Sequence, residues 1–452
     1  MFERVFKLSE HKTTVKTEVM AGITTFMTMA YILAVNPSVL GSTGMDTTAV
    51  LLATALASCL GTLCMAFMAN LPFALSAGMG LNAFMAYTVV AGYGYSWQVA
   101  LLAVFIEGLI FIVLSLTNIR EAIFNAIPLT LKKGVSVGIG LFIAFIGLQN
   151  SGLCVDSATL VGIISFPENF HTAGICALLT LIGLFFTAVF YTRKMKGAIL
   201  YGILLTWILG MLCQVTGLYV PTPDAGFYSL FPSWGMTDFS KLGLTFGQCF
   251  NVDFSAVGIV NFIVVIFSFL FVDIFDTLGT LIGVATKAKM LDKDGKLPGI
   301  KPALLADSIA TSAGAILGTS TTTFVESASG VAVGGRTGLT ALVTGILFLV
   351  STLFAPIFTA IPSFATAPAL IMVGFLMVGT VTEINFDLDN LTESIPAYLA
   401  IIAMPLFYSI SEGISLGVIS YVLLNVAAGK GKKVAPLMYV LAVLFVLKYI
   451  FL

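Results

Sequence analysis

The chain has 452 residues, of which 58% are hydrophobic and 10% are charged, with a formal net charge of −1 and a mean hydropathy of +1.05. Soluble domains carry about 25% charged residues, so this composition excludes an ordinary water-soluble protein, and the net charge gives no indication of a nucleic-acid partner. Apolar blocks of the ~20 residues that a helix needs to cross a bilayer recur along the chain. We therefore predict an all-α polytopic protein in the lipid bilayer of the cell membrane.

The first 18 residues, MFERVFKLSEHKTTVKTE, are charged and amphipathic, and they contain no signal-peptide cleavage site. We predict that they form a surface helix on the cytoplasmic side, leading into the first span.

Hydropathy predicts fourteen spans in two groups of seven. The first group lies near 19–40, 47–70, 73–91, 97–117, 134–151, 172–191 and 197–216, and the second near 256–285, 302–318, 322–334, 337–358, 366–381, 395–410 and 412–428. The chain then divides into a first repeat (1–216), an extracytoplasmic loop (217–255), a second repeat (256–428), and a basic loop with an extra apolar tail (429–452). The tail exceeds the fourteen-span plan and has no assigned place in it.

Lysine and arginine residues set the predicted orientation. With a cytoplasmic N-terminus, the basic clusters fall on the cytoplasmic side and the long loop 217–255 holds only Lys241, in agreement with the positive-inside rule. The clusters are Lys132/Lys133, Arg193/Lys194/Lys196, residues 287–301, Arg336 and Lys430/Lys432/Lys433.

An odd number of spans per half means that the two halves enter the membrane from opposite sides, so similarity between them implies inverted repeats. GAILYGILL from Gly197 is similar to GISLGVISY from Gly413, and GVSVGIGLFIAFIGL from Gly134 is similar to APALIMVGFLMVGTV from Ala367. Inverted repeats are typical of secondary transporters that hold substrate near the membrane midplane.

The third span of each half is interrupted. NLPFALSAGMGLNAF (70–84) places Pro72 and two glycines in a short apolar segment, and GTSTTTFVESASGVAVGG (318–335) places a threonine run before Glu326 and further glycines. Each segment begins with residues that favour extended backbone and then becomes helical. Such a pair of interrupted segments predicts the binding site of a transporter.

Acidic residues inside predicted spans are the candidate functional groups, because an Asp at a helix centre costs ~2.5–3.5 kcal/mol on insertion scales. Asp273 and Asp276 lie three residues apart in FVDIFDTLGTLIG, on one helix face that Thr280 continues. The structural alternative is that one Asp bonds a neighbouring helix. Glu107 and Glu412 are interpreted as structural acids, Glu412 at the start of its span.

Glu326 lies where a half-helix should begin, so it is predicted either to cap that helix or to accept hydrogen bonds from a ligand. Asn82, in GMGLNAF, offers amide donors and an acceptor that suit the edge of a heterocycle. Gly78 and Gly80 would permit close backbone approach.

Two absences narrow the function. His11 and His171 lie outside the predicted spans, and no Lys or Arg falls within a span core away from its ends. These features favour a neutral or cationic substrate, with Asp and Glu carrying coupling protons. The sequence has no nucleotide-binding motif or metal-ligand cluster, so we predict neither an enzyme nor an ATP-driven pump, and we expect no cofactor besides the coupling proton.

Four motifs in order carry a family resemblance: TTFMTMAYILAVNP (24–37), SAGMGLNAF (76–84), FVDIFDTLGTLIG (271–283) and VESASGVAVGGRTGLT (325–340). Together they resemble the AzgA-like purine permeases, a branch of the nucleobase–ascorbate transporter superfamily that comprises proton symporters for adenine, guanine and hypoxanthine. The resemblance covers nearly the whole chain.

The resemblance implies fourteen segments in two inverted repeats, with a core domain (segments 1–4 and 8–11) and a gate domain (segments 5–7 and 12–14). Short strands in segments 3 and 10 are expected to cross near the midplane, with purine bound between core and gate. The family's site residues match Asp276, Glu326, Gly80 and Asn82. Relatives selective for uracil or xanthine carry Glu and His in segment 8, where this chain has Asp276 and Thr280, which favours the purine branch.

The sequence thus predicts a proton-coupled purine symporter. The predicted substrate-binding residues are Glu326, Asp276, Asn82, Gly80, Phe324 and Ser327, with Phe324 placed to stack on the base. The predicted proton-coupling residues are Asp276, Glu326, Asp273 and Thr280. An anion exchanger or channel on the same architecture, and a non-transporting receptor, are the alternatives; a homodimer and the preferred purine are left open.

Overall fold

The computed structural model describes residues 2–117, 126–157, 160–222, 226–232, 235–253, 257–287, 290, 297–324, 327–387 and 389–451, without the side chains at 260, 275, 276, 278–280, 282–287, 328 and 451. Within this part of the chain, ten helices are long and apolar enough to cross a membrane. Four shorter apolar helices accompany them: Met79–Gly92, Asn261–Ile274, Leu391–Leu406 and Pro436–Ile450. The predicted polytopic, mostly helical membrane fold is confirmed.

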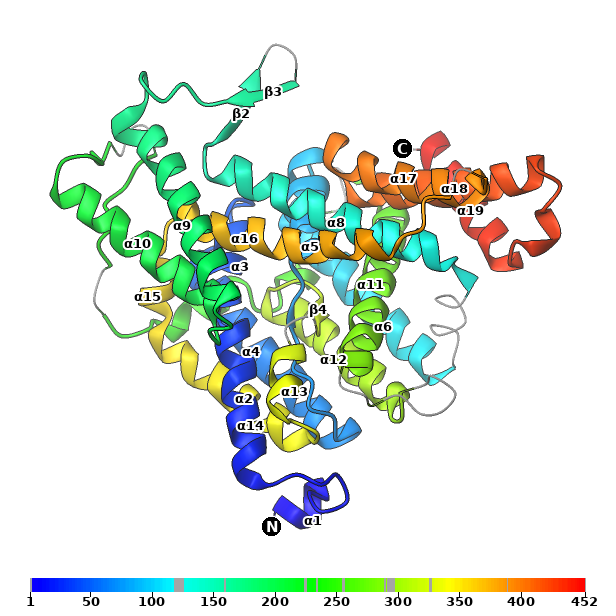
Figure 1. Cartoon of the computed structure of the whole chain (residues 1–452), viewed down its shortest axis with the longest axis horizontal. Helices are drawn as coiled ribbons and strands as arrows, with labels where there is room; N and C mark the ends of the chain where they lie inside the picture. Colours follow the sequence, from blue (N-terminus) through cyan, green and yellow to red (C-terminus); the bar gives the residue numbers. More distant parts are fainter. Residues whose placement is uncertain are drawn as a thin grey trace.

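One set of elements, which we call the strand-containing bundle, packs around a small central sheet, with α12 against α4 and α6, and α14 against α2 and α4. Figure 1 shows α2 and α11 running steeply in this bundle. Its elements are α2 (Val15–Met29), α3 (Ile32–Gly41), α4 (Thr47–Cys64), β1 (Ser76–Ala77), α5 (Met79–Ala83), α6 (Trp97–Leu116), α11 (Ile259–Lys287), α12 (Ile300–Leu317), β4 (Thr322–Thr323), α13 (Ala328–Val333), α14 (Gly338–Ser351) and α15 (Ala355–Thr359).

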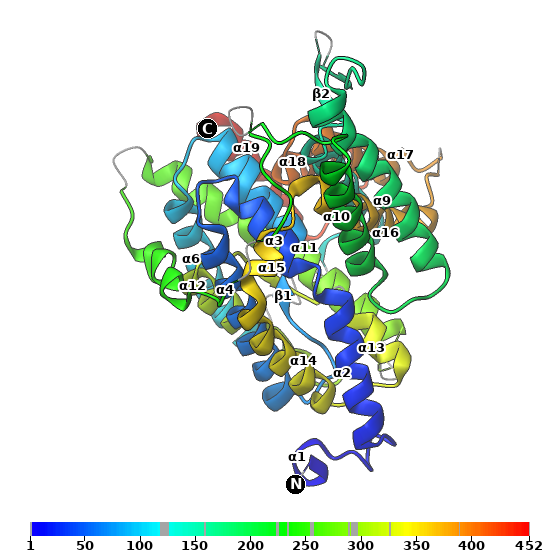
Figure 2. The same cartoon turned by 90° about the vertical axis from the view of Figure 1, so that its left-hand side faces the viewer.

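The remaining long helices form a second bundle, in which α16 packs on α8 and α9, and α17 packs on α8 and α18. Figure 2 shows α9, α10 and α16 on the side away from α4, α6 and α12. The members are α8 (Leu129–Asn150), α9 (Ile175–Thr192), α10 (Ala198–Val215), α16 (Ser363–Val378), α17 (Leu391–Leu406) and α18 (Ile410–Ala427), and α19 (Pro436–Phe451) lies against α18.

Glycines permit the close crossing of α8 and α16. A Cβ atom at Gly374 would overlap Gly140 O, and one at Gly140 would lie 2.7 Å from Gly374 O. Small residues that let backbones approach closely are a common basis of helix packing in membranes.

The two interrupted segments contain strands followed by helix. In the first half, β1 precedes α5, which continues as a π-helix over Phe84–Gly92. In the second half, Gly318 ends α12 with φ +107°, and the β-branched residues of β4 follow before α13. The strands expected in these two segments are present.

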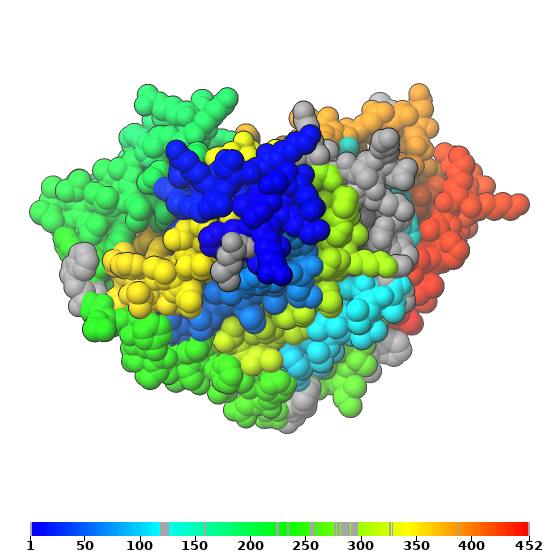
Figure 3. Space-filling model, turned by 90° about the horizontal axis from the view of Figure 1, so that it is seen from below, coloured from blue at the N-terminus to red at the C-terminus, as the bar shows by residue number. Residues whose placement is uncertain are grey.

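Two regions differ from the sequence-based expectations. The predicted N-terminal surface helix is wrong in extent. In the described part of residues 1–18, α1 (Phe2–Phe6) and the first turn of α2 from Val15 are helical, and Lys7 and Lys12 between them have φ values of 53° and 54°, which interrupt a continuous helix. Phe6 and Leu8 are buried against Leu339, so this N-terminal stretch lies over the middle of the face seen in Figure 3. A hairpin of β2 (Cys154–Ser157) and β3 (Leu160–Ile163), which the sequence analysis did not predict, also protrudes from the molecule.

Candidate functional site

A two-stranded antiparallel sheet joins the interrupted segments of the two halves. Ser76 of β1 pairs with Thr323 of β4, and Ala77 pairs with Thr322. Gly78 N–H donates to Thr321 O at 3.0 Å. A two-stranded sheet is marginally stable by itself, so contacts with the surrounding helices must hold it in place.

Side-chain hydroxyls from neighbouring elements hold the backbone of the segment that leads into β1. The hydroxyl of Thr62 in α4 donates to Leu75 O at 3.1 Å and accepts from Leu75 N–H at 3.0 Å. The hydroxyl of Ser327 does the same for Ala74, donating at 3.1 Å and accepting at 2.9 Å. Each hydroxyl therefore bonds both the N–H and the C=O group of one buried residue. In a larger sheet, a neighbouring strand would satisfy these groups.

Side chains hold the segment that leads into β4. Residues 319–322 form a continuous series of buried hydroxyls, which we call the hydroxyl series. Each member contacts a buried amide or carboxyl group on a different element, with Asn36 donating to Thr319 at 2.9 Å, and Ser320 donating to Asn82, Thr321 to Glu107 at 3.2 Å and Thr322 to Asp307 at 3.1 Å. The series thus fixes the direction of the chain immediately before Phe324.

Asn82 is the predicted site residue for which the structure provides the most specific geometry. It lies in α5, is fully buried, and accepts a hydrogen bond from Ser320 through Oδ1. Its Nδ2 has no hydrogen-bond partner within the described part of the chain, and neither does Thr323 Oγ1 on β4. A buried amide with two unused donors is costly, so this position suits a ligand that supplies acceptors.

Three further predicted substrate-binding residues lie close to the sheet. Phe324 is fully buried directly after β4, and its carbonyl accepts from Ser327 N–H at 3.1 Å. Ser327 uses its hydroxyl on Ala74, so the structure gives this side chain a structural contact between segments 3 and 10. Gly80 faces the second bundle: a Cβ atom there would lie 3.0 Å from Ile139 Cγ2.

The predicted proton-coupling residues are only partly described. Asp273 is fully buried in α11 and accepts a hydrogen bond from Thr277 Oγ1 at 2.5 Å, one helical turn away. Asp276 and Thr280 also lie in α11, but their side chains fall outside the described residues. Glu326 falls in the undescribed pair 325–326. The contacts predicted for Asp276, Thr280 and Glu326 stay predictions.

Two buried acids, Asp307 and Glu18, were not among the residues predicted from the sequence. Asp307 lies inside the predicted span 302–318, so the criterion that selected Asp273 would also have found it. Glu18 precedes the first predicted span by one residue and offered no such signal. Its carboxylate accepts from the N–H groups of Arg336 and Thr337, at 2.9 and 3.2 Å, and from Thr340 Oγ1 at 2.6 Å. Glu18 therefore joins the first helix of one half to the turn that follows α13.

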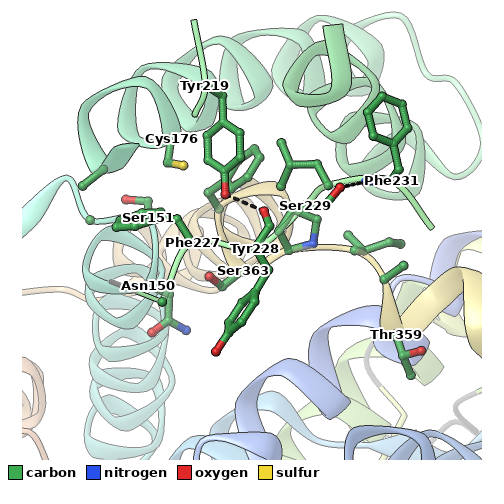
Figure 4. A pocket seen from close by; sticks show the side chains of 18 of the residues that line it. Asn150, Ser151, Cys176, Tyr219, Phe227, Tyr228, Ser229, Phe231, Thr359 and Ser363 are labelled. Carbon is green, nitrogen blue, oxygen red and sulfur yellow. Dashed lines mark hydrogen bonds between the residues drawn. The ribbon is translucent and has the colours of Figure 1, made fainter. Parts of the chain in front are cut away.

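A cavity of about 590 Å³ lies elsewhere, between the ends of α8 and α9, the connection from α15 to α16, and the loop residues 226–231. Figure 4 shows Tyr228 projecting into it, with Asn150 and Ser363 on its wall. Burial raises the pKa of Tyr219 to about 12, so its hydroxyl stays protonated and donates to Tyr228 O at 2.7 Å. None of the predicted site residues lines this cavity.

In the described part of the chain, no group of three or more His, Cys, Asp or Glu residues is placed to hold a metal ion. The described polar groups around the sheet are hydroxyls, amides and carboxyls, which suit hydrogen bonding to an uncharged ligand.

Comparison with known proteins identifies the family. The model of the permease family matches residues 16–446. The chain belongs to this family. This match, together with relatives named as adenine and guanine/hypoxanthine permeases, confirms the resemblance to the AzgA-like purine permeases of the nucleobase–ascorbate transporter superfamily.

Relatives in this family match over their whole lengths. A putative permease of Methanocaldococcus jannaschii is 47% identical over 100% of this chain and 98% of its own. The guanine/hypoxanthine permease PbuG of Bacillus subtilis is 46% identical over 99% of both chains, and the adenine permease AdeP of Escherichia coli is 42% identical over 100% of this chain and 96% of its own.

Among solved structures, the transmembrane domain of the cyanobacterial bicarbonate transporter BicA is similar in fold, with a TM-score of 0.58 over 91% of this chain and 97% of that one. The sequence identity is 16%, so this likeness concerns the fold alone.

Proposed function

We propose that this permease is a proton-coupled symporter that imports purine nucleobases, namely adenine, guanine or hypoxanthine, across the cell membrane. The observation that carries the proposal is the buried amide of Asn82, whose Nδ2 has no partner among the described residues and lies beside the sheet that joins the two interrupted segments. Full-length relatives named as adenine and guanine/hypoxanthine permeases support this substrate class.

The chemistry of the site supports a neutral heterocycle. Purines present ring nitrogens and carbonyl groups as acceptors, together with N–H donors, and Asn82 Nδ2 can donate to such acceptors. The described side-chain groups that contact the hydroxyl series are amides, carboxyls and hydroxyls, none of them cationic. We assign Glu326 and Asp276 to the base, with one of them protonated during the cycle, since a buried carboxyl readily takes up a proton.

Helix packing supports the inverted repeat, in which segment 1 corresponds to segment 8 and so on along the two halves. The helices α4 and α6 lie in segments 2 and 4, and their counterparts α12 and α14 lie in segments 9 and 11. The repeat therefore relates the contact of α6 with α12 to the contact of α14 with α4, and both contacts are present. The pairs α9–α10 and α17–α18 correspond in the same way, as do α9–α16 and α17–α8. The strands β1 and β4 pair with each other as counterparts.

We assign the strand-containing bundle to the core and the second bundle to the gate, with transport by an elevator-like movement between them. Gly80 lies at the contact between these bundles, next to Ile139 of α8 and Ile410 of α18. A side chain at position 80 would obstruct sliding at this contact, which gives Gly80 a role in movement besides its predicted role at the substrate.

Uptake into vesicles or cells tests the proposal. Labelled adenine, guanine, hypoxanthine and uracil are supplied with and without a protonophore, and we expect accumulation of at least one purine, little uracil uptake, and loss of accumulation when the proton gradient is dissipated. Flux of bicarbonate or sulfate that purines do not inhibit would instead support an anion exchanger. Purine binding without accumulation would support a receptor.

The site assignment is tested with Asp276→Asn and Glu326→Gln at normal surface expression. Each substitution keeps the size of the side chain but removes its charge and its ability to exchange a proton, so we expect a large loss of accumulation. Wild-type purine uptake by both variants would contradict the assignment.

A further inference from the structure

The C-terminal helix α19 lies outside the predicted fourteen segments, but it is packed against the rest of the protein. It packs against α18 and α11, and the ring of Phe445 lies 5.1 Å from that of Phe271 in α11, measured between centroids. The opposite face exposes Val440, Val443 and Val446. One face of α19 is thus bound to the protein, and the other is apolar, as contact with lipid requires.

A buried lysine fastens this helix. Lys448 is 4% exposed, and its ammonium group forms an ion pair with Glu412 Oε1 of α18 and donates to Ser411 Oγ at 2.9 Å. Tyr449 donates to the other oxygen of Glu412. A lysine inside an apolar helix is costly unless it is paired, and intramembrane charges are usually functional.

The ion pair is connected to the helix that carries the predicted proton-coupling acids. Ser411 Oγ lies 3.0 Å from Ser268 Oγ of α11, and both serines are buried. Because an ammonium group only donates, Ser411 accepts from Lys448 and can direct its own proton toward Ser268. Ser268 precedes Asp276 by eight residues, which corresponds to about 12 Å along a helix.

We propose that Lys448 is a positioning residue for transport, which through Ser411 holds α11 against α18 in the conformation seen here. The inference rests on the proposed function, because α11 belongs to the bundle that moves and α18 to the bundle that stays. During the cycle, the Ser268–Ser411 bond breaks and the Lys448–Glu412 pair remains within the stationary part. The bond forms again when the transporter returns to the conformation seen here.

The first experiment measures uptake by the full chain for Lys448→Met, Glu412→Gln, the double variant, Ser268→Ala, and Lys433→Met as an exposed-lysine control. Glu412→Gln leaves the buried ammonium group of Lys448 without its counter-charge, and Lys448→Met does the same for the half-buried Glu412 carboxylate, so each single variant should melt lower, Glu412→Gln by several degrees. The double variant should regain most of that stability. For the double variant and for Ser268→Ala, we expect the maximal uptake rate to fall about threefold or more, with KM within about twofold of wild type, because the return to the conformation seen here loses its stabilised end point. Lys433→Met should behave as wild type.

The second experiment does not depend on transport. Cysteines replacing Ser268 and Ser411 are oxidised in membranes, and the linked peptide is quantified by mass spectrometry. A thiol keeps a weaker form of the donor and acceptor capacity of a hydroxyl, so Lys448 can still orient the substituted position 411. We expect the link to form about threefold faster, or more, when Lys448 and Glu412 are present than when both carry the neutral substitutions Lys448→Met and Glu412→Gln.

Two results would overturn the proposal: equal cross-linking rates in the two backgrounds, or wild-type maximal uptake by both the double variant and Ser268→Ala. Absence of purine uptake by the wild type, with cross-linking still dependent on Lys448, would instead refute the proposed function and leave the positioning of α11 standing.

Discussion

The two strands of the central sheet are anchored in opposite ways. The segment before β1 is apolar, and neighbouring hydroxyls hold its backbone at Ala74 and Leu75. The segment before β4 is polar, and its own side chains reach out to four separate elements. The polar segment therefore depends on the identity of each side chain, whereas the apolar segment depends on the helices that surround it.

This difference assigns separate tasks to the two halves. A backbone-anchored strand can supply a fixed edge and close approach, but it offers few side-chain groups to a ligand. A side-chain-anchored strand places buried polar atoms in defined positions, and those atoms remain costly wherever a partner is missing. Asn82 is the point where the two halves meet, because it lies on the apolar half and accepts from Ser320 on the polar one.

The largest effect is expected for Asn82→Leu, which removes this meeting point while keeping a similar volume. Ser320 would lose its acceptor and the purine would lose a donor, and each such loss costs about 1–3 kcal/mol, so uptake should fall at least tenfold by this estimate. Initial rates of labelled purine uptake at equal surface expression measure the change. Ser320→Ala removes only the bond between the two side chains, and an equal loss in both variants would mean that Asn82 does not touch the substrate.

A smaller effect, on stability, is expected for Ser327→Ala. This substitution leaves the buried N–H and C=O groups of Ala74 without the hydroxyl that bonds both, at a cost of about 1–3 kcal/mol. The melting temperature of the purified protein should fall, while Ser363→Ala, which removes an exposed hydroxyl, should leave it unchanged. An unchanged melting temperature in Ser327→Ala would show that the apolar segment does not need this anchor.

Neighbouring residues of β4 provide a matched pair with a still smaller effect. Thr322→Val removes a donor to Asp307 and should destabilise the protein by about 1 kcal/mol. Thr323→Val removes a hydroxyl that has no partner among the described residues and should leave the melting temperature within error of wild type. Uptake by Thr323→Val then tests the substrate side: a loss of uptake without a loss of stability would place this hydroxyl at the purine.

The sequence indicated where the interruptions lie but not what surrounds them. Proline before β1 and glycines directly after it, and a run of β-branched residues at β4, are local features, so the two strands were predictable. The partners of the hydroxyl series were not predictable, because Thr321 and Glu107 are 214 positions apart and no local pattern relates them. Glu18 was missed for the same reason, since its burial depends on the turn at Arg336 and Thr337.

The site itself was predictable to a similar extent. Asp273 was predicted from its position within a span, and the structure shows that it is buried in α11. Burial is expected for a functional acid and for a structural one. Position could not reveal that the hydroxyl of Ser327 is engaged with Ala74, because that contact requires the two halves to be folded against each other. The position of Lys448 was not predicted, because no pattern in the tail indicates that its ammonium group pairs with Glu412.

The smallest effect on stability and uptake together is expected for a substitution of Asp46, which caps the N-terminus of α4 and lies in neither strand. Asp46 accepts from Thr48 and Ala49 N–H at the start of α4 and pairs with Lys241 at 3.1 Å. Burial would raise its pKa, but the Ala49 and Lys241 contacts outweigh burial and hold the pKa below its ordinary value of 3.8. Its contribution is therefore fully present above the ordinary pKa and is lost as the pH falls through the lowered value.

Asp46→Asn should consequently change stability by less than about 1 kcal/mol at pH 7, since Asn caps a helix about as well as Asp and a partly exposed ion pair contributes little. Melting temperatures of the wild type and the variant should converge as the pH falls below the ordinary pKa of 3.8 and through the lowered pKa of the folded wild-type carboxyl. Uptake at pH 7 should be unaffected, because the contact lies in neither strand. A large loss of uptake in Asp46→Asn would mean that the loop bearing Lys241 takes part in the movement. Residues outside the two strands would then also be required for transport.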